Sequence, residues 1–331
     1  MKAAIVILNW NGKHLMEEFL PKVIAHAEGL ATIYVADNAS TDDSVAYVEQ
    51  HFPEVRLVLN KQNYGYAGGY NQALREIDAD LYILMNSDIE TTPGWLLPIL
   101  SRFEQHKKTA IIQPKILDYK KRDSFEYAGA AGGFIDRLGY PYCRGRIFNA
   151  LEKDLGQYDD EREIFWASGA CLCIRSEVFW KLKGFDEDFF AHQEEIDLCW
   201  RAQKFGYQVE YVGTSAVFHV GGATLNNMNP TKTFLNFRNT LFTLTKNAPK
   251  RYLPWLVIAR LVLDGVAGIK FLLEGKAIHT WAIVRAHGSY YRKAYKMFKK
   301  RSDTPTLKKY YAIQSVVWNH FVLQKKIFGE L

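Results

Sequence analysis

Short apolar runs alternate with stretches of helical periodicity over the first 115 residues, and this alternation limits the fold more than any other feature. The runs typical of strands cover residues 3–8, 32–36, 56–59 and 81–85. Residues 15–27 and 43–50 show the spacing of helices instead. Such a βαβ series predicts an α/β fold with a mostly parallel central sheet flanked by helices, whose ligands bind at the carboxyl ends of the strands.

The middle of the chain is less regular. Residues 117–163 are rich in glycine and scattered charges, and we expect them to form one wall of a cleft. Strand-like sequence resumes at residues 164–174, a helix is predicted over 194–205, and a further strand over 208–219 ends in a histidine. These elements would complete a catalytic domain of residues 1–240, with a helical, basic extension over residues 241–331.

The composition indicates a folded protein with a large core. Of its 331 residues, 48% are hydrophobic and 14% are aromatic, which excludes a disordered chain. The net charge of +6 is mild, and most of the basic excess follows residue 246, in runs such as 296–301. No nucleic-acid-binding module accompanies these basic residues, so a nucleic-acid partner is not expected.

The N-terminus and the cysteines indicate a cytoplasmic protein. The apolar run in MKAAIVILNWNG ends at Asn9 without the small-residue cleavage site of a signal peptide. The cysteines lack the paired spacing of zinc ligands, and we expect them to be reduced thiols. They are Cys143, Cys171, Cys173 and Cys199.

Residues 253–273 are apolar but contain Arg260, Asp264 and Lys270, which argues against a membrane-spanning helix. An amphipathic helix flanked by Lys and Arg, with Trp255 and Trp281 nearby, can lie in a membrane interface. The alternative is a helix that packs on its own domain. Both interpretations stay open, so peripheral contact with the inner face of the cytoplasmic membrane is one prediction.

Asp37, in the run VADNASTDDS, falls where a predicted strand ends and a helix begins. A carboxylate there can accept the imide N–H of a uracil or thymine ring. Helix capping, with Ser40 as the N-cap and Asp43 as its partner, is the alternative. Asn9 ends the neighbouring predicted strand.

A glycine-rich stretch, NYGYAGGYN, follows the strand at residues 56–59 and includes Asn63 and Gly65. Glycines let the backbone come close to a nucleotide. The stretch has neither the GKS or GKT of a Walker loop nor GxGxxG spacing.

The apolar run at residues 81–85 ends on Asn86-Ser87-Asp88. Asp88 is a hard oxygen ligand for Mg²⁺ or Mn²⁺, and the ion would neutralise a diphosphate. His219 could supply a nitrogen ligand to the same ion, which favours Mn²⁺. An ordinary turn and a structural histidine are the alternatives.

Three acidic residues, Glu194, Glu195 and Asp197, stand at the start of a predicted helix in FFAHQEEIDLCWR. Crowded, partly buried carboxyls suit a general base, because one pKa rises towards the working pH. The alternative is that acidic residues simply complement the helix dipole.

Eight motifs occur in order over roughly residues 1–240 and together resemble family 2 glycosyltransferases of the GT-A fold, most of all the bacterial rhamnosyltransferase-like members. The motifs are ILNWNG, VADNAST, QNYGYAGGYN, MNSD, ASGACLCIRSEVF, GFDEDFF, EEIDLCWR and FHVGG. The C-terminal part of the chain lies outside this resemblance.

The resemblance implies an inverting transfer from a UDP- or dTDP-linked sugar to a hydroxyl of a glycan or lipid-linked acceptor in cell-surface polysaccharide synthesis. It places a divalent Mn²⁺ or Mg²⁺ ion on Asp88 and His219, and makes Glu195 the catalytic base. The implied donor-nucleotide residues are Asn9, Asp37, Asn63, Gly65 and Asn86. The implied acceptor-side residues are Trp166, Gly169, Ala170 and Glu194.

The chain departs from the family pattern at two motifs. Asn86-Ser87-Asp88 stands in place of Asp-x-Asp, which removes one charged ligand, and Glu194-Glu195 stands in place of Glu-Asp, which lengthens the base by one methylene. Two alternatives remain: a nucleotidyltransferase on a similar sheet, and a non-catalytic relative that binds a nucleotide or glycan. The first lacks its expected basic glycine-rich loop, since residues 9–13 read only NWNGK.

Overall fold

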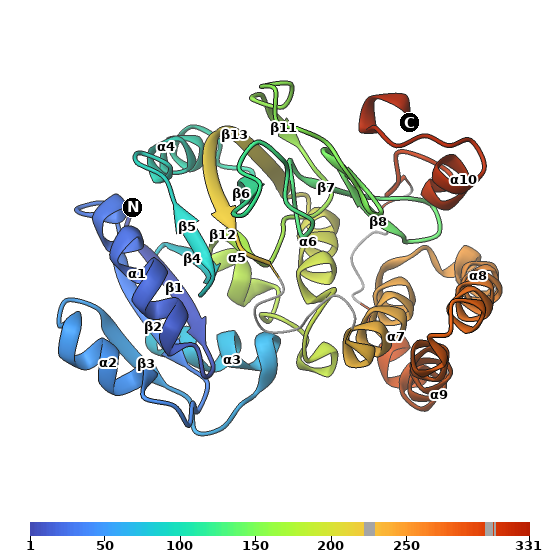
Figure 1. Ribbon diagram of the computed structural model, residues 1–331, viewed down its shortest axis with the longest axis horizontal. Coiled ribbons are helices and arrows are strands. Elements are labelled where there is room, and N and C mark those ends of the chain that lie inside the picture. The colour runs from blue at the N-terminus through green and yellow to red at the C-terminus, as the bar shows by residue number, and fades with distance from the viewer. Residues whose placement is uncertain (222–228, 302–306, 308) are drawn as a thin grey trace.

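A computed structural model describes residues 1–221, 229–301, 307 and 309–331, so Gly222, the last residue of FHVGG, lies outside the described residues. A nine-stranded sheet forms its centre, in the order β11-β13-β6-β12-β4-β1-β2-β3, with β5 paired to β13 (Figure 1). The strands are β1 (Ala3–Asn9), β2 (Thr32–Asp37), β3 (Arg56–Leu59), β4 (Leu81–Asn86), β5 (Ile89–Thr91), β6 (Thr109–Asp118), β11 (Glu161–Glu163), β12 (Cys171–Arg175) and β13 (Gln208–His219).

The sheet combines a parallel half with a half of mixed strand direction. The four strands expected from the N-terminal pattern are parallel neighbours, in the order β3-β2-β1-β4. Beyond them β12 is antiparallel to both β4 and β6, and β13 is parallel to β6. The central sheet is therefore mixed: its N-terminal strands are all parallel, as predicted, and β6 and β13 form a further parallel pair.

The predicted strand over residues 164–174 is wrong in its first half, because β12 begins only at Cys171. The Ser168 backbone N–H donates to the side chain of Gln113 at 2.7 Å, and the chain then turns towards β12. Cys171 and Cys173 do share one buried face of β12, and all four cysteines are free and buried.

Residues 117–163 hold short strands where only loops were expected. The strands β7 (Gly133–Ile135), β8 (Pro141–Cys143), β9 (Arg146–Ile147) and β10 (Ala150–Leu151) form a four-stranded antiparallel sheet. Alternation was not visible in such two- and three-residue strands, because a period of two needs at least four residues to be recognised.

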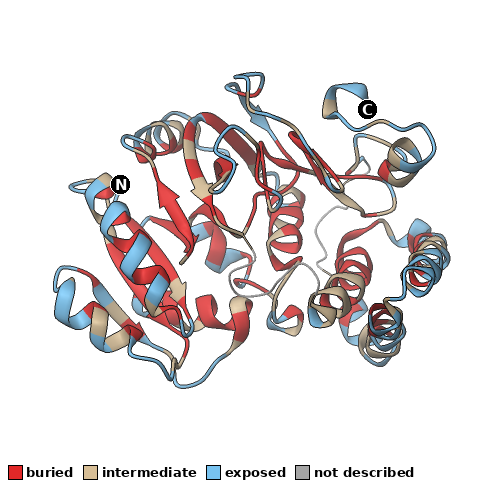
Figure 2. Cartoon of the chain, in the orientation of Figure 1, coloured by how far each residue is buried: buried red, intermediate tan, exposed pale blue. Residues whose placement is uncertain are grey.

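The helices of the N-terminal two thirds cover the large sheet (Figure 1). They are α1 (Lys13–Ala27), α2 (Ser44–His51), α3 (Gly65–Ala73), α4 (Leu96–Gln105), α5 (Ser176–Lys181) and α6 (Glu194–Lys204). Successive side chains of β1 face opposite sides of the sheet. Ile5 and Ile7 join Phe19 of α1 in one buried cluster, while Val6 joins Tyr70 of α3 in the other. Figure 2 shows the central strands buried and the outward sides of the flanking helices exposed.

The glycine-rich stretch is part of helix α3, not a turn before a helix. A Cβ atom on Gly68 would lie 2.8 Å from the Cβ of Tyr64, and one on Gly69 would lie 3.0 Å from the side chain of Leu8. Close packing of α3 on β1 therefore requires Gly69, whereas Gly68 leaves room for the side chain of Tyr64 at the start of the helix.

The C-terminal part is helical, as expected. It contains α7 (Pro230–Asn247), α8 (Leu253–Leu273), α9 (Ala277–Lys299) and α10 (Val316–Phe321). Residue 240, the expected end of the catalytic domain, falls inside α7. Among the described residues, no helix has the length and apolar character needed to cross a membrane.

Two of the three charges that interrupt α8 point into the protein, whereas Lys270 is exposed. Arg260 and Asp264 are buried and lie 3.2 Å apart. The Arg260 guanidinium lies 3.6 Å from the ring centroid of Tyr140, and Asp264 lies 3.1 Å from His287 of α9. One face of α8 thus packs on its own domain.

Candidate active site

The ends of three parallel strands bring polar side chains to one edge of the sheet. In the β1–β2 register Asn9 lies opposite Asp37, and in the β1–β4 register Leu8 lies opposite Asn86. On the other half of the sheet β5 runs beside the end of β13, so that His219 lies opposite Ile89, the residue after Asp88. The fold therefore brings together side chains that were predicted from four separate motifs.

Asp37 is held in a buried hydrogen-bond network. Its carboxylate accepts hydrogen bonds from the Asn9 amide at 3.0 Å, the Ser40 hydroxyl at 2.5 Å and the Ser40 backbone N–H at 2.8 Å. The predicted capping role of Ser40 is wrong, because α2 begins at Ser44, after Asp43. Ser40 orients Asp37 instead, and a carboxylate with about four acceptor sites keeps one for a further donor.

Asn63 and Gly65 form a tight turn at the start of α3. The Asn63 side-chain oxygen accepts from the Gly65 N–H at 2.8 Å and from the Asn38 amide at 3.0 Å. Gly65 has a φ of 71°, and a Cβ there would lie 2.7 Å from the ring of Phe190. Only glycine therefore lets α3 approach the segment that carries Phe190.

Asp88 and His219 lie together, with their Oδ1 and Nε2 atoms 3.1 Å apart, and Glu126 lies 3.2 Å from Nδ1 on the other side of the ring. Burial disfavours a charged imidazole, but Asp88 and Glu126 outweigh it and raise the pKa of His219 to about 10. Burial would also raise the pKa of Asp88, yet the adjacent imidazolium lowers it. The Asn86 amide lies 3.4 Å from the same ring.

The donor set at this position fits a divalent cation only in part. Asp88 offers an oxygen and His219 a nitrogen, a combination that Mn²⁺ accepts. Within the described ranges no three His, Cys, Asp or Glu side chains are grouped so that they could hold a metal. The imidazole ring of His219 lies between the carboxylates of Asp88 and Glu126, which contact opposite nitrogens of the ring. Two protein ligands leave room for the phosphate oxygens of a substrate.

Glu194 and Glu195 lie in the first turn of α6, each with a buried Oε2 atom that has no hydrogen-bond partner. Burial raises the pKa of Glu195 to about 7. Burial, together with the neighbouring Glu195, raises the pKa of Glu194 well above its ordinary range. Burial is the main reason that the pKa of Tyr66 is raised, and the carboxyls of Glu194 and Glu195 raise it further. The two carboxyls therefore lie close to the start of α3.

Asp197, the third acid of this cluster, has a different environment. Its carboxylate accepts from Arg201 at 2.8 Å, from Lys246 at 2.7 Å and from Asn247 at 2.8 Å. Burial opposes its ionisation, but Arg201 and Lys246 hold the pKa of Asp197 far below its usual value. Asp197 is therefore a permanently charged anchor, whereas Glu195 can exchange a proton near neutral pH.

The backbone leading into α6 is strained. Phe190, His192 and Gln193 have φ angles of 67°, 69° and 73°, a region that residues other than glycine rarely adopt. Such conformations cost about 1–3 kcal/mol each and persist where surrounding contacts enforce them. They set the direction from which α6, and with it Glu195, enters the site.

Helix α7 supplies the contacts that hold this strained segment. The Asn239 amide donates to the carbonyl oxygens of Phe189, Ala191 and His192 at 2.8–3.0 Å. Arg238 donates to the carbonyl of Phe189 at 2.9 Å. Sequence reasoning missed this role of α7.

A signal for α7 was present in the sequence, because two polar pairs, 238–239 and 246–247, stand eight residues apart in the helix. That spacing places both pairs on one side of the helix.

The predicted acceptor-side residues connect the site to its surroundings. Trp166 is buried, and its indole N–H donates to the carbonyl of Phe134 at 2.9 Å. The Gly169 carbonyl accepts from the Tyr66 hydroxyl at 2.7 Å, and the Ala170 carbonyl accepts from the Asn86 N–H at 3.0 Å. These bonds join the turn before β12 to both α3 and β4. A role in acceptor binding stays a prediction for all three.

Comparison with known proteins identifies the family. The model of glycosyl transferase family 2 matches residues 4–183. The chain belongs to this family. It is a glycosyltransferase with the GT-A fold, and the nucleotidyltransferase alternative is set aside.

Individual relatives agree with this assignment. N-acetylglucosaminyl-diphospho-decaprenol L-rhamnosyltransferase of Mycobacterium tuberculosis is 30% identical over 226 residues, which cover 63% of this chain and 72% of that protein. S. aureus TarS in complex with UDP-GlcNAc superposes with a TM-score of 0.58 at 13% identity, over 91% of this chain and 84% of the other. GalNAc-T7 with UDP, GalNAc and Mn²⁺ reaches 0.60 at 14% identity, over 76% and 48% of the two chains.

Proposed function

We propose that this glycosyltransferase moves a sugar, with inversion at the anomeric carbon, from a UDP- or dTDP-linked donor to a hydroxyl of a glycan or lipid-linked acceptor in cell-surface polysaccharide synthesis. The observation that carries the proposal is the half-buried Glu195, whose buried Oε2 atom has no hydrogen-bond partner and whose pKa, raised by burial to about 7, suits a general base. The names of the relatives add support, since one acts on a diphospho-decaprenol acceptor and two solved structures hold UDP or UDP-GlcNAc.

In the proposed reaction Glu195 accepts the proton of the acceptor hydroxyl as its oxygen forms a bond to the anomeric carbon. The bond from that carbon to the diphosphate oxygen breaks on the opposite face, and its electron pair leaves with the nucleoside diphosphate. Asp37 would accept the imide N–H of the pyrimidine, beside Asn9. Asn63 and Gly65 would shape the path of the nucleotide.

Asp88 and His219 would hold the divalent ion, with Asn86 beside them. When bound, Mn²⁺ or Mg²⁺ would offset the charge that develops on the leaving diphosphate. On the acceptor side, the turn that contains Gly169 and Ala170 would lie next to the Glu194 carboxyl.

A thermal-shift panel of UDP, dTDP, GDP and CDP, each with Mn²⁺ or with EDTA, tests the donor site. We expect UDP or dTDP to raise the melting temperature in Mn²⁺ but not in EDTA, because a ligand at a hundredfold its Kd stabilises by about 2.7 kcal/mol. The Asp88→Asn variant should lose this shift, and Asp123→Asn, at an exposed site, should keep it. Absence of a shift with every nucleotide would contradict the proposal and favour a non-catalytic glycan-binding role.

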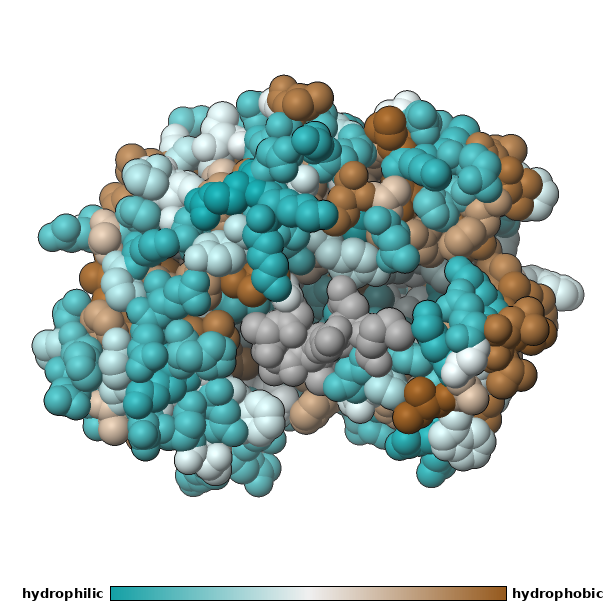
Figure 3. All heavy atoms as spheres, viewed as in Figure 1, coloured by the Kyte–Doolittle hydropathy of each residue, from teal (hydrophilic) through white to brown (hydrophobic). Residues whose placement is uncertain are grey.

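The outer face of α8 supports a membrane contact as part of this function. Its exposed side chains are apolar and recur at helical spacing: Trp255 is 72% exposed, Val262 62%, Val266 58%, Ile269 61% and Leu273 83%. Figure 3 shows apolar side chains gathered along the edge of the molecule where α8 lies. Apolar patches of this extent mark interaction surfaces.

Basic residues surround this face, which favours an anionic membrane over a protein partner. They include Lys250, Arg251, Lys270 and Lys276. Within the proposal, residues 1–240 form the catalytic domain and residues 241–331 attach it to the inner face of the cytoplasmic membrane.

Co-sedimentation with phosphatidylglycerol vesicles tests this contact. The double variant Val262→Glu/Val266→Glu is expected to stay in the supernatant when the parent chain sediments, because two carboxylates on the apolar face oppose insertion. The matched control, Leu59→Glu/Leu155→Glu, changes two apolar residues of similar exposure away from α8 and should sediment like the parent. Equal sedimentation of all three proteins would reject the contact.

A further inference from the structure

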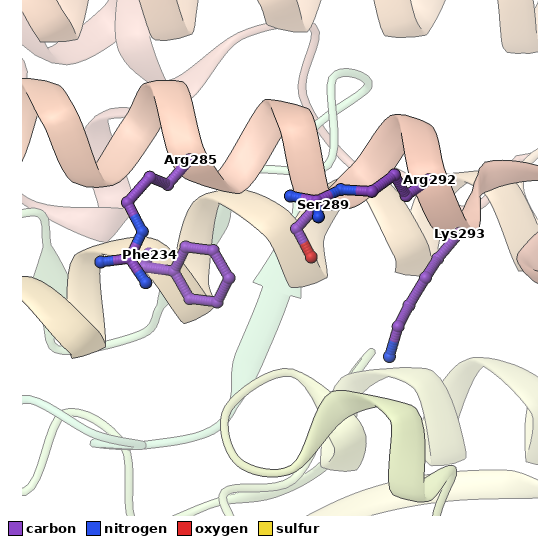
Figure 4. A pocket seen from close by; sticks show the side chains of 5 residues that line it. All are labelled: Phe234, Arg285, Ser289, Arg292 and Lys293. Atoms are coloured by element: carbon purple, nitrogen blue, oxygen red, sulfur yellow. The ribbon is translucent and has the colours of Figure 1, made fainter.

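Helix α9 presents four polar residues to a pocket beside α7. Arg285, Ser289, Arg292 and Lys293 line it together with Phe234 of α7, and Figure 4 shows Phe234 next to Arg285. The pocket has a volume of about 230 Å³. Roughly eight water molecules would occupy that volume, at about 30 Å³ each. It is smaller than the ~300–1,000 Å³ of most sites for drug-sized ligands, so it suits a small group and not a whole nucleotide.

The cations in this pocket are unequally paired. Lys293 lies 3.1 Å from the carboxylate of Asp188. Neither Arg285 nor Arg292 forms an ion pair with any carboxylate of the described residues. The Arg285 guanidinium lies 5.5 Å from the ring centroid of Phe234, and Arg292 donates through Nε to the carbonyl of Gly288. Most of their N–H groups are therefore available to phosphate oxygens, which guanidinium binds in a bidentate manner.

The pocket adjoins the segment that positions the proposed base. Phe234 stands one helical turn before Arg238, which donates to the carbonyls of Asp188 and Phe189. Lys293 contacts the side chain of Asp188 from the other helix. Both walls of the pocket are thus connected to the strained segment that leads into Glu195.

The same pocket borders the apolar surface. Exposed aromatic residues of α9, Trp281 at 60%, Tyr291 at 59% and Tyr295 at 70%, lie along its side next to Arg285 and Arg292. An acceptor anchored in a membrane through a lipid chain would reach these arginines first. They lie between the exposed aromatic residues of α9 and the strained segment that leads into Glu195.

We propose that Arg285, Arg292 and Ser289 bind the diphosphate group of a lipid-linked acceptor sugar. The two arginines are seven residues apart, about 10 Å along the helix axis, so that their long side chains can reach both phosphates from either end. This inference rests on the proposed function and specifies the class of acceptor: a lipid diphosphate whose sugar hydroxyl reaches Glu195.

Titration of the full chain with geranyl diphosphate tests the site. The donor site is first saturated with Mn²⁺ and the nucleoside diphosphate found in the thermal-shift panel, so that the probe cannot occupy it. The variant Arg285→Gln/Arg292→Gln is expected to bind the probe at least tenfold more weakly than the parent. The control Lys120→Gln/Lys121→Gln removes the same charge at two exposed lysines elsewhere and should bind like the parent. Equal affinity of all three proteins would overturn the proposal.

Two further arms identify the source of the phosphate. Excess unlabelled diphosphate ester should displace labelled geranyl diphosphate from the parent chain, whereas inorganic phosphate should not. If phosphate displaced the probe equally well, the site would be a general anion site, and the proposal would be overturned. If the double variant loses binding to phosphatidylglycerol vesicles but keeps its affinity for the probe, the arginines bind lipid headgroups and the proposal is likewise wrong.

Failure of this proposal is distinguishable from failure of the proposed function. A double variant that still shows the nucleotide shift in Mn²⁺ retains a working donor site, whatever its affinity for the probe. If no nucleotide binds even the parent chain, the probe titration is carried out without one, and the comparison of the two variants still decides the inference.

Discussion

The Glu195→Gln variant is expected to lose transfer activity by about 10²–10⁴-fold, because the amide cannot accept the proton of the acceptor hydroxyl. The substitution is nearly isosteric, so the Mn²⁺-dependent nucleotide shift should be unchanged. Initial rates with a saturating donor measure the loss. Glu177→Gln, at an exposed position of α5, is the matched control and should retain full activity.

The neighbouring carboxyl provides the decisive comparison. Glu194 also has a buried, unpartnered oxygen, and burial together with the neighbouring Glu195 raises its pKa well above its ordinary range. If Glu194→Gln abolished transfer while Glu195→Gln retained it, the base would be Glu194. If both variants retained transfer, neither carboxyl would be the base.

The raised pKa of Glu195 also sets the pH dependence. A base must be ionised, so kcat/KM of the parent chain should fall as the pH drops below about 7. Stability should change in the opposite direction. Because the pKa in the folded state lies above the ordinary value of 4.5, the protonated carboxyl favours folding, and this contribution is lost as the pH rises from about 4.5 through 7. Glu195→Gln should therefore be more stable than the parent at pH 8.

The Asp197→Ala variant is expected to lose about 3–5 kcal/mol of unfolding free energy, the usual cost of removing one partner from a buried ionic network. Asp197 is fully buried and joins α6 to α7 through Lys246 and Asn247. Its loss leaves the Lys246 ammonium with Asp186 alone at 2.7 Å. The melting temperature should fall by roughly 4–7 °C.

The matched control for this prediction is Asp123→Ala, which removes a carboxylate that is 62% exposed from its pair with Lys153. Exposed pairs contribute about 0–1 kcal/mol, so the melting temperature should hardly move. Equal melting temperatures for the two variants would show that the α6–α7 network adds nothing to stability. A chain ending at residue 240 lacks Lys246 and Asn247 and should be destabilised as well.

Local sequence patterns were sufficient to predict those parts of the structure that depend on residues close together in the chain. The strands from Ala3 to Asn86 follow apolar runs, and polar residues such as Asp37 and Asp88 follow their ends, because a buried parallel strand must be apolar throughout. Local pattern failed at Ser40, whose spacing matched a capping box although its hydroxyl binds Asp37. It also did not show that a glycine of α3, Gly69, packs against Leu8 of β1.

The sequence by itself determined the order of the N-terminal strands and helices, the family, and the candidates from Asn9 to His219, since each is a feature of a short segment. The family resemblance pointed to Glu195 as the base, and only the tertiary structure showed that the acids of α6 have different environments. Glu195 and Asp197 look alike in sequence, but Lys246, 49 residues further on, pairs with Asp197, whereas the buried Oε2 atom of Glu195 has no hydrogen-bond partner. A pKa depends on charges and burial in space, and contacts over such separations leave no trace in local periodicity.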